Sequence, residues 1–182
     1  QGFGDGIEQD AAAVRLFADS GLNFLVSSSF SKSFSLYGER VGALSIVTNS
    51  KEEAGRVLSQ AKRVIRTNYS NPPTHGATVV ASVLNSVELR AMWEQELGEM
   101  RERIRDMRMA MVEQLAAQGA KRDFSFVARQ RGMFSYSGLT AEQVERLKNE
   151  FAIYAVGTGR ICVAALNRNN LDAVTRAIAQ VI

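Results

Sequence analysis

The chain has 182 residues, 46% of them hydrophobic and 23% charged, with only two prolines, and its formal net charge is +3. This composition belongs to a globular protein and excludes disordered and fibrous classes. The single cysteine cannot form an internal disulfide, and no cluster of Cys and His residues has metal-ligand spacing. We therefore expect no metal site and a reducing compartment, the cytoplasm.

The basic residues are spread through the chain and alternate with acidic ones, as in MRERIRDMR at 100–108. Without a basic block interleaved with aromatic residues, this pattern predicts a solvated helix surface rather than a nucleic-acid interface. No run approaches the roughly 18 apolar residues of a membrane span, so no membrane partner is expected. The start, QGFGDGIEQD, lacks the features of a signal peptide, and its opening with Gln1 inside a Gly-rich turn indicates a fragment.

In the first part of the chain, helical and strand patterns alternate. Apolar spacing predicts a helix over 8–19, a short strand over 23–30 that ends in serines, and a second strand over 42–48. The second strand has no polar alternation and is expected to be buried on both faces. A helix follows over 51–66, ends at the turn-forming cluster NYSNPPTHG, and a further helix starts near Thr74.

One long amphipathic helix is predicted next. Apolar residues recur at steps of three and four and end before Gly119: Leu89, Met92, Trp93, Leu97, Met100, Ile104, Met107, Met111 and Leu115. A single stripe of this kind is typical of a helix that bridges two domains, with a coiled coil as the alternative.

The last third reads as short strands and two helices. We expect strands over 123–130, 132–139, 153–156 and 159–166, a helix from its N-cap Thr140 to Phe151, and a final helix from Asn169 or Asn170 to the end. The alternation of strands and helices predicts an α/β fold. The long helix divides it into a first domain over 1–85, a connecting helix over 86–118 and a second domain over 119–182.

The stretch SSSFSKSFSLYGERVG, residues 27–42, places one lysine among six serines at the end of the first predicted strand. Phe30 and Phe34 flank Lys32, so its stem is expected in an apolar setting, which favours the uncharged, nucleophilic amine. The hydroxyls and Arg40 would form an anion cradle. A nucleophilic lysine beside a phosphate site is the pattern of pyridoxal 5'-phosphate (PLP) chemistry, although serine-rich turns also contain Lys and Arg without any catalytic role.

Four segments carry a more specific signal: SFSKSFSLYGERVGAL, IRTNYSNPPTHGA, GMFSYSGL and TGRICVAAL. In this order they resemble the C-terminal half of the aspartate and aromatic-amino-acid aminotransferases, which are fold-type I PLP-dependent enzymes of class I. The resemblance covers essentially the whole chain, and SLYGERVG is most similar to the aromatic, or tyrosine, aminotransferases. It implies the C-terminal part of the PLP-binding large-domain sheet, a long interdomain helix and a small α/β domain.

The resemblance also implies roles for three residues toward PLP. Lys32 matches the lysine that holds the cofactor covalently and, once released by substrate, moves the proton at the substrate α-carbon. Ser29 and Arg40 match ligands of the cofactor phosphate. The rest of the family's cofactor site is supplied by segments upstream, so the 182 residues alone are expected to be inactive, with sheet edges and apolar faces exposed.

Three further residues match substrate-binding positions of the family. Arg160 matches the arginine that pairs with the substrate α-carboxylate, and Arg66 the one that reaches into the neighbouring subunit of a homodimer and binds the distal carboxylate. Phe134 matches an aromatic residue on the substrate-facing wall. Taken singly, Arg160 could cap a strand end, Arg66 could be the cationic last turn of its helix, and Phe134 could be plain core.

The implied activity is transamination of aromatic amino acids and aspartate with 2-oxoglutarate as acceptor, so the partners are small amino and 2-oxo acids. Two alternatives stay open. One is another fold-type I reaction, such as that of a lyase or decarboxylase, and the other is a non-catalytic fragment that serves as an assembly module.

Overall fold

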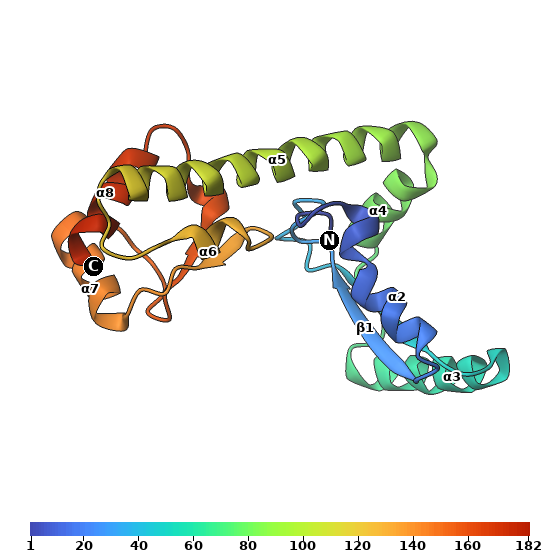
Figure 1. The fold of residues 1–182 in the computed structure, drawn as a ribbon. Coiled ribbons are helices and arrows are strands. Elements are labelled where there is room, and N and C mark those ends of the chain that lie inside the picture. Colours follow the sequence, from blue (N-terminus) through green and yellow to red (C-terminus); the bar gives the residue numbers. More distant parts are fainter. The chain divides into compact units, whose positions relative to one another are not determined.

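The computed structural model describes every residue from Gln1 to Ile182. The chain forms two compact units, residues 1–98 and 99–182, and the boundary falls inside helix α5, Val87–Ala117. Each unit contains both helices and strands (Figure 1), so the predicted α/β class is confirmed. None of the helices combines the length and apolar character that crossing a membrane requires.

The first unit contains the elements that the spacing predicts. They are α1 Ile7–Asp10, α2 Ala12–Asp19, β1 Phe24–Ser29, β2 Gly42–Val47, α3 Lys51–Asn68 and α4 His75–Asn85. The helix expected over 8–19 is interrupted at Ala11, where α1 ends. The Asp10 carboxylate accepts backbone N–H bonds from Gly2 and Gly4, at 2.8 and 3.0 Å. Burial raises the pKa of this carboxyl, but the backbone hydrogen bonds outweigh it and leave the pKa below its ordinary value.

Strands β1 and β2 pair with each other in antiparallel register, from Phe24 opposite Val47 to Ser29 opposite Gly42. The sheet has only these two strands in this chain. The prediction that the second strand is buried on both faces is wrong, because most residues of β2 are exposed and little of this chain covers its faces. Leu25 is 67% exposed and Leu44 59% exposed.

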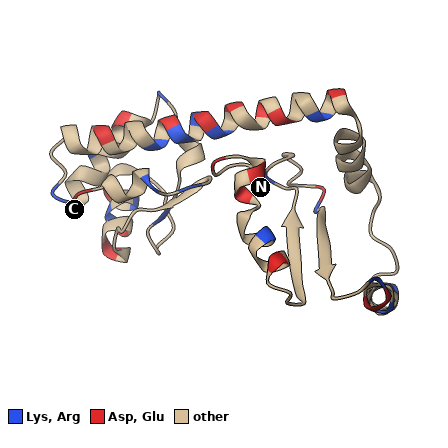
Figure 2. Cartoon of the chain, turned by 45° about the vertical axis from the view of Figure 1, so that its right-hand side comes forward, with Lys and Arg blue, Asp and Glu red and all other residues tan.

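Helix α5 confirms the prediction of one long helix. It begins after Ser86, whose backbone is extended, and it ends before Gly119, whose left-handed φ of +71° lets Ala120 N–H bond back to the Leu115 carbonyl. Basic and acidic residues are interspersed along α5 (Figure 2). The predicted apolar stripe is buried over part of its length, at Leu97, Ile104, Met111 and Leu115, and Trp93 is half-buried.

The second unit consists of α6 Ser125–Ala128, β3 Phe134–Tyr136, α7 Ala141–Phe151, β4 Arg160–Cys162, the 3-10 helix η1 Val163–Ala165 and α8 Leu171–Val181. Strands β3 and β4 form a second antiparallel pair. Residues from five elements fill the core of this unit and are almost completely buried: Leu115, Val127, Leu147, Val163 and Ile178.

The prediction of a strand over 123–130 is wrong, because this segment contains helix α6 and no strand. Asp123 accepts the backbone N–H of Ser125 over 2.8 Å and its hydroxyl over 2.6 Å. The Asp123 pKa is lowered by the hydrogen bond from the Ser125 hydroxyl and then by the one from its backbone N–H. Such a local turn favours a helix start over an extended chain.

The predictions of strands over 153–156 and 159–166 are also wrong over most of their length. The first is irregular, and it follows Ala152, which ends α7 with a left-handed φ of +54°. The other is a strand only at Arg160–Cys162 and then becomes η1. The GMFSYSGL strand is likewise shorter than predicted, at Phe134–Tyr136.

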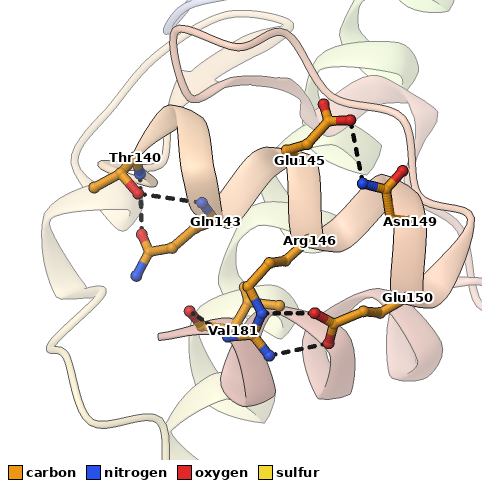
Figure 3. A network of polar contacts seen from close by, with 7 residues as sticks. All are labelled: Thr140, Gln143, Glu145, Arg146, Asn149, Glu150 and Val181. Atoms are coloured by element: carbon orange, nitrogen blue, oxygen red, sulfur yellow. Dashed lines mark hydrogen bonds and ion pairs between the residues drawn. The ribbon is translucent and has the colours of Figure 1, made fainter.

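Helix α7 begins at the predicted N-cap. The Thr140 hydroxyl accepts the Gln143 N–H over 3.2 Å, and the Gln143 side chain accepts the Thr140 N–H over 2.9 Å (Figure 3). This reciprocal pair is a capping box. Further along, Arg146 binds Glu150 through two hydrogen bonds and reaches the carbonyl of Val181 in α8.

Replacing Thr140 with Ala should lower the free energy of unfolding by about 1 kcal/mol, because the first-turn N–H groups lose their acceptor. The measurement is urea unfolding followed by far-ultraviolet circular dichroism. Thr140→Ser is the matched control, since it keeps the hydroxyl and should stay close to wild type. Equal losses in both variants would contradict the role given to the cap.

Candidate functional site

Lys32 lies in the loop 30–41 that joins β1 to β2. Phe30 N–H donates to the Val41 carbonyl over 3.2 Å and closes the loop at its base. Ser35 N–H donates to the Lys32 carbonyl over 3.1 Å. The lysine therefore sits on a tight turn directly after the strand, and its side chain is half-buried.

Trp93, from helix α5, holds this turn in place. Its indole N–H donates to the Ser33 carbonyl over 2.7 Å, and its ring stacks on Phe34 with centroids 4.6 Å apart and planes 17° apart. Phe30 meets Phe34 edge to face at 5.5 Å. One polar contact and two ring contacts thus fix the backbone on both sides of Lys32.

Tyr37 links Lys32 to Arg40. The Lys32 Nζ lies 4.5 Å from the centroid of the Tyr37 ring, a cation–π distance, and Arg40 Nη1 donates to the Tyr37 carbonyl over 2.9 Å. Arg40 is exposed and has a left-handed φ of +52°. Ser29 is exposed at the end of β1, where its hydroxyl accepts the Ser31 N–H over 3.2 Å. Of the three residues predicted to bind the cofactor, Lys32 and Arg40 lie within this loop, and Ser29 is the last residue of the strand that leads into it.

The end of the Lys32 loop packs on helix α4. A Cβ at the buried Gly76 would lie 3.0 Å from the Glu39 Cβ and 3.1 Å from the Val41 Cβ. A side chain at this position would force its neighbours to shift by a few tenths of an ångström, so glycine suits the close approach of the helix. The contact fixes the backbone next to Arg40.

Arg160 and Phe134 form a second group, in the second unit. The register of β3 and β4 places Phe134 opposite Cys162, so Arg160 is its diagonal neighbour on the same face. The Arg160 guanidinium carbon lies 4.9 Å from the centroid of the Phe134 ring. Both side chains line a cavity of about 420 Å³ whose other walls are mostly apolar, among them Leu147, Leu166 and Ile178.

The backbone before Arg160 is fixed by Ser137. Its N–H and hydroxyl both donate to the Gly159 carbonyl, over 2.9 and 2.6 Å, and the side chain is fully buried. Gly159 has a φ of +79°, and a Cβ there would lie 2.6 Å from the Leu139 carbonyl oxygen. The glycine of the TGR segment is thus required by its conformation and by the close approach of Leu139.

Arg66 belongs to neither group. It lies in the last turn of α3, is exposed, and donates to the Ser70 hydroxyl over 2.5 Å. No hydrogen bond or ion pair joins it to Lys32, Ser29 or Arg40 of the same unit.

The cationic side chains of the predicted site share one feature, the lack of an acidic partner within this chain. Lys32, Arg40, Arg66 and Arg160 form no ion pair with a carboxylate, whereas Arg90 and Arg146 are paired with glutamates one turn away. An arginine without a carboxylate partner keeps its forked donors available to an anionic ligand.

Two residues of this arrangement were not singled out from the sequence. Tyr37 stands in the same stretch as Lys32. An aromatic residue five positions after a candidate nucleophile could have indicated a contact between the two. Trp93 was assigned only to the apolar stripe of the long helix, and its contact with Ser33 spans 60 residues of sequence, so no local pattern could reveal it.

Residues 1–178 match the family model of aminotransferase class I and II, and the chain belongs to this family. It is 83% identical over 182 residues to an aspartate aminotransferase of Pseudomonas aeruginosa and 53% identical to an aromatic-amino-acid aminotransferase of Escherichia coli. Both alignments cover all of this chain and 46% of the relative. The chain thus spans about half the length of the curated relatives it matches, and the resemblance to this family is confirmed. Its placement in their C-terminal half stays a prediction.

Solved structures agree with this assignment. The aromatic-amino-acid aminotransferase from Burkholderia pseudomallei, covalently bound to pyridoxal phosphate, superposes with a TM-score of 0.96 at 74% identity, over 100% of this chain and 45% of that one. A mitochondrial aspartate aminotransferase from Trypanosoma brucei superposes with the same score at 46% identity, over 100% of this chain and 48% of that one. Proteins named for aspartate and for aromatic substrates are both similar to this chain.

Replacing Trp93 with Phe should loosen the Lys32 turn, because the ring stack is kept but the hydrogen bond to Ser33 is lost. Loss of one such bond costs about 1 kcal/mol, so amide hydrogen exchange at residues 31–35 should become about fivefold faster. Mass spectrometry of peptides from the complete polypeptide measures this exchange. Met92→Ala, at the neighbouring exposed position, should leave it unchanged. Unaltered exchange in Trp93→Phe would show that Trp93 does not hold the turn.

Proposed function

We propose that this chain is part of a PLP-dependent aminotransferase that acts on aromatic amino acids and aspartate, with 2-oxoglutarate as acceptor. The observation that carries the proposal is the placement of Lys32: an amine without an acidic partner, on a turn fixed by Trp93, with Arg40 in the same loop. The proposed enzyme is cytoplasmic, and the 182 residues alone are expected to be inactive, as the sequence predicts.

Lys32, Arg40 and Ser29 fit the aldehyde and the phosphate of PLP. An aldehyde requires a nucleophilic amine, which Lys32 provides, and a phosphate requires cationic and hydroxyl donors, which Arg40 and Ser29 provide. When bound, PLP supplies the electron sink that makes the α-hydrogen of an amino acid acidic. Lys32 would then take the proton from the α-carbon and return it during the reverse half-reaction with the 2-oxo acid.

The second unit would orient the substrate. Arg160 carries a forked guanidinium on a strand, where its backbone is fixed by pairing, and it would bind the α-carboxylate through two hydrogen bonds. Phe134, at 4.9 Å from that guanidinium, would form a wall against which the substrate side chain packs. The cation–π contact holds the arginine before the carboxylate arrives.

Arg66 would bind the distal carboxylate of aspartate or 2-oxoglutarate in the partner subunit's site of a homodimer. Its exposure and its lack of a carboxylate partner support a role in binding an anion from outside its own subunit. The similarity to relatives named for aspartate and for aromatic amino acids supports a substrate range that includes both.

Replacing Lys32 with Ala in the complete polypeptide should lower the rate of 2-oxo acid formation by at least about a hundredfold, because a positioned proton-transfer group contributes 10² to 10⁴. The assay follows the oxo acids formed from aspartate, tyrosine and phenylalanine with 2-oxoglutarate. Lys51→Ala, at an exposed lysine, is the matched control and should retain full activity. Formation of an amine or release of ammonia in place of an oxo acid would identify a decarboxylase or lyase, and no turnover at all would favour the assembly module.

Replacing Arg66 with Ala should reduce kcat/KM for aspartate about 10- to 100-fold, since a hydrogen bond to a charged group is worth about 1.5–3 kcal/mol. Turnover of phenylalanine, which has no distal carboxylate, should change far less. Arg56→Ala, at an exposed position on the same helix, controls for loss of charge on α3. Equal losses with aspartate and phenylalanine would show that Arg66 does not recognise the distal carboxylate.

A further inference from the structure

Strand β3 has only three residues, yet it carries Phe134 of the candidate site. One edge pairs with β4. At the other edge the Gln130 side chain makes the two hydrogen bonds that a neighbouring strand would make. It donates to the Tyr136 carbonyl over 2.9 Å and accepts the Tyr136 N–H over 2.8 Å. A third support comes from Arg108 on helix α5.

Arg108 reaches β3 from the side opposite Phe134. Its Nε donates to the Ser135 hydroxyl over 3.2 Å, and its Nη2 donates to the Gly132 carbonyl over 2.5 Å and, more weakly, to the Phe134 carbonyl at 3.5 Å. Successive side chains of a strand point to opposite faces. The buried Ser135 therefore faces Arg108, and Phe134 faces the same side as Arg160.

The surroundings of Arg108 are unusual for an arginine. It is only 4% exposed, although the MRERIRDMR pattern predicts a solvated helix surface, so that prediction is wrong at this position. Its acceptors are two carbonyls and a hydroxyl rather than a carboxylate. Burial lowers its pKa, and the charge of Arg131 lowers it further.

A buried charge of this kind is a poor source of stability, since well-packed apolar side chains of similar volume are often as good or better. A planar guanidinium does offer several donors in a fixed geometry, which neither lysine nor methionine can reproduce. The main effect of its hydrogen bonds is therefore to fix the position and orientation of β3. Their contribution to the stability of the unit is expected to be small.

We propose that Arg108 is a positioning residue for the substrate carboxylate site. By holding β3 at Phe134 and Ser135, and the segment before it at Gly132, Arg108 fixes the position of the Phe134 ring, which in turn orients the Arg160 guanidinium. It does not touch the substrate. This inference rests on the proposed function, because it assigns Arg160 to carboxylate binding.

The test compares Arg108→Met and Arg108→Lys with wild type in the complete polypeptide. Binding of succinate, an unreactive dicarboxylate, is measured by calorimetry, and kinetics are measured with aspartate. Both variants should raise the succinate Kd and the aspartate KM, about tenfold for methionine and at least threefold for lysine, while kcat stays within about threefold. A misoriented Arg160 guanidinium weakens binding of the carboxylate, whereas the proton transfer at Lys32 is not directly affected.

Thr175→Ala is the matched control for stability. Thr175 is fully buried, bonds to Gln114 and to the Leu171 carbonyl, and is not among the residues that line the cavity with Phe134 and Arg160. This variant should lower the Tm of the protein and leave both the succinate Kd and the aspartate KM unchanged. If Arg108→Met does not fold, Ser135→Ala takes its place, since it removes one acceptor of Arg108 and should raise the Kd in the same direction.

Two outcomes would overturn the inference. In one, the Arg108 variants lower the Tm as Thr175→Ala does but keep wild-type affinity for succinate, which would leave Arg108 a purely structural role. In the other, wild type does not bind succinate, so the carboxylate site is absent and the proposed function fails with it. Wild type that binds succinate without forming oxo acids would refute the proposed function alone, and the Kd comparison would still test Arg108.

Discussion

The hydrogen bond from the Trp93 indole to the Ser33 carbonyl, 2.7 Å long, is the contact on which the candidate site most depends. Lys32 is on a loop, and loops are the more mobile parts of a fold. The indole fixes the peptide next to the lysine, and its stack on Phe34 adds a second contact to the same turn. The turn thereby becomes a defined support for Lys32.

The distribution of the predicted site residues follows the division of the chain into two units. Lys32, Ser29 and Arg40, which match cofactor-binding positions, all belong to the first unit. Arg160 and Phe134, which match substrate-binding positions, belong to the second. Helix α5 contributes a support in each unit, Trp93 for the lysine turn and Arg108 for β3. The long helix thus serves both groups from its interior positions, in addition to connecting the units.

Features of this structure that depend on neighbouring residues could be predicted from the sequence, whereas features that depend on distant residues could not. The helices were predicted well, since their apolar spacing and the Thr140 cap are local features, and the turn with Lys32 was found from its serines. The strand expected over 123–130 failed because a run of aromatic and β-branched residues was weighed without the Asp123 turn that starts α6. The burial of β2 failed because an apolar run does not show which elements cover the faces of a strand, and β2 is mostly exposed. Arg108 was missed because its acceptors lie 24 to 27 residues away along the chain.

The most direct test of the central claim, that the fixed turn presents Lys32 to the aldehyde of PLP, is borohydride reduction of the complete polypeptide with added PLP. Intact-mass and peptide mass spectrometry then locate the attached group. The account predicts one pyridoxyl group per chain, on Lys32, with the same yield in the Lys51→Ala variant. A pyridoxyl group spread over several exposed lysines, or none on Lys32, would contradict it.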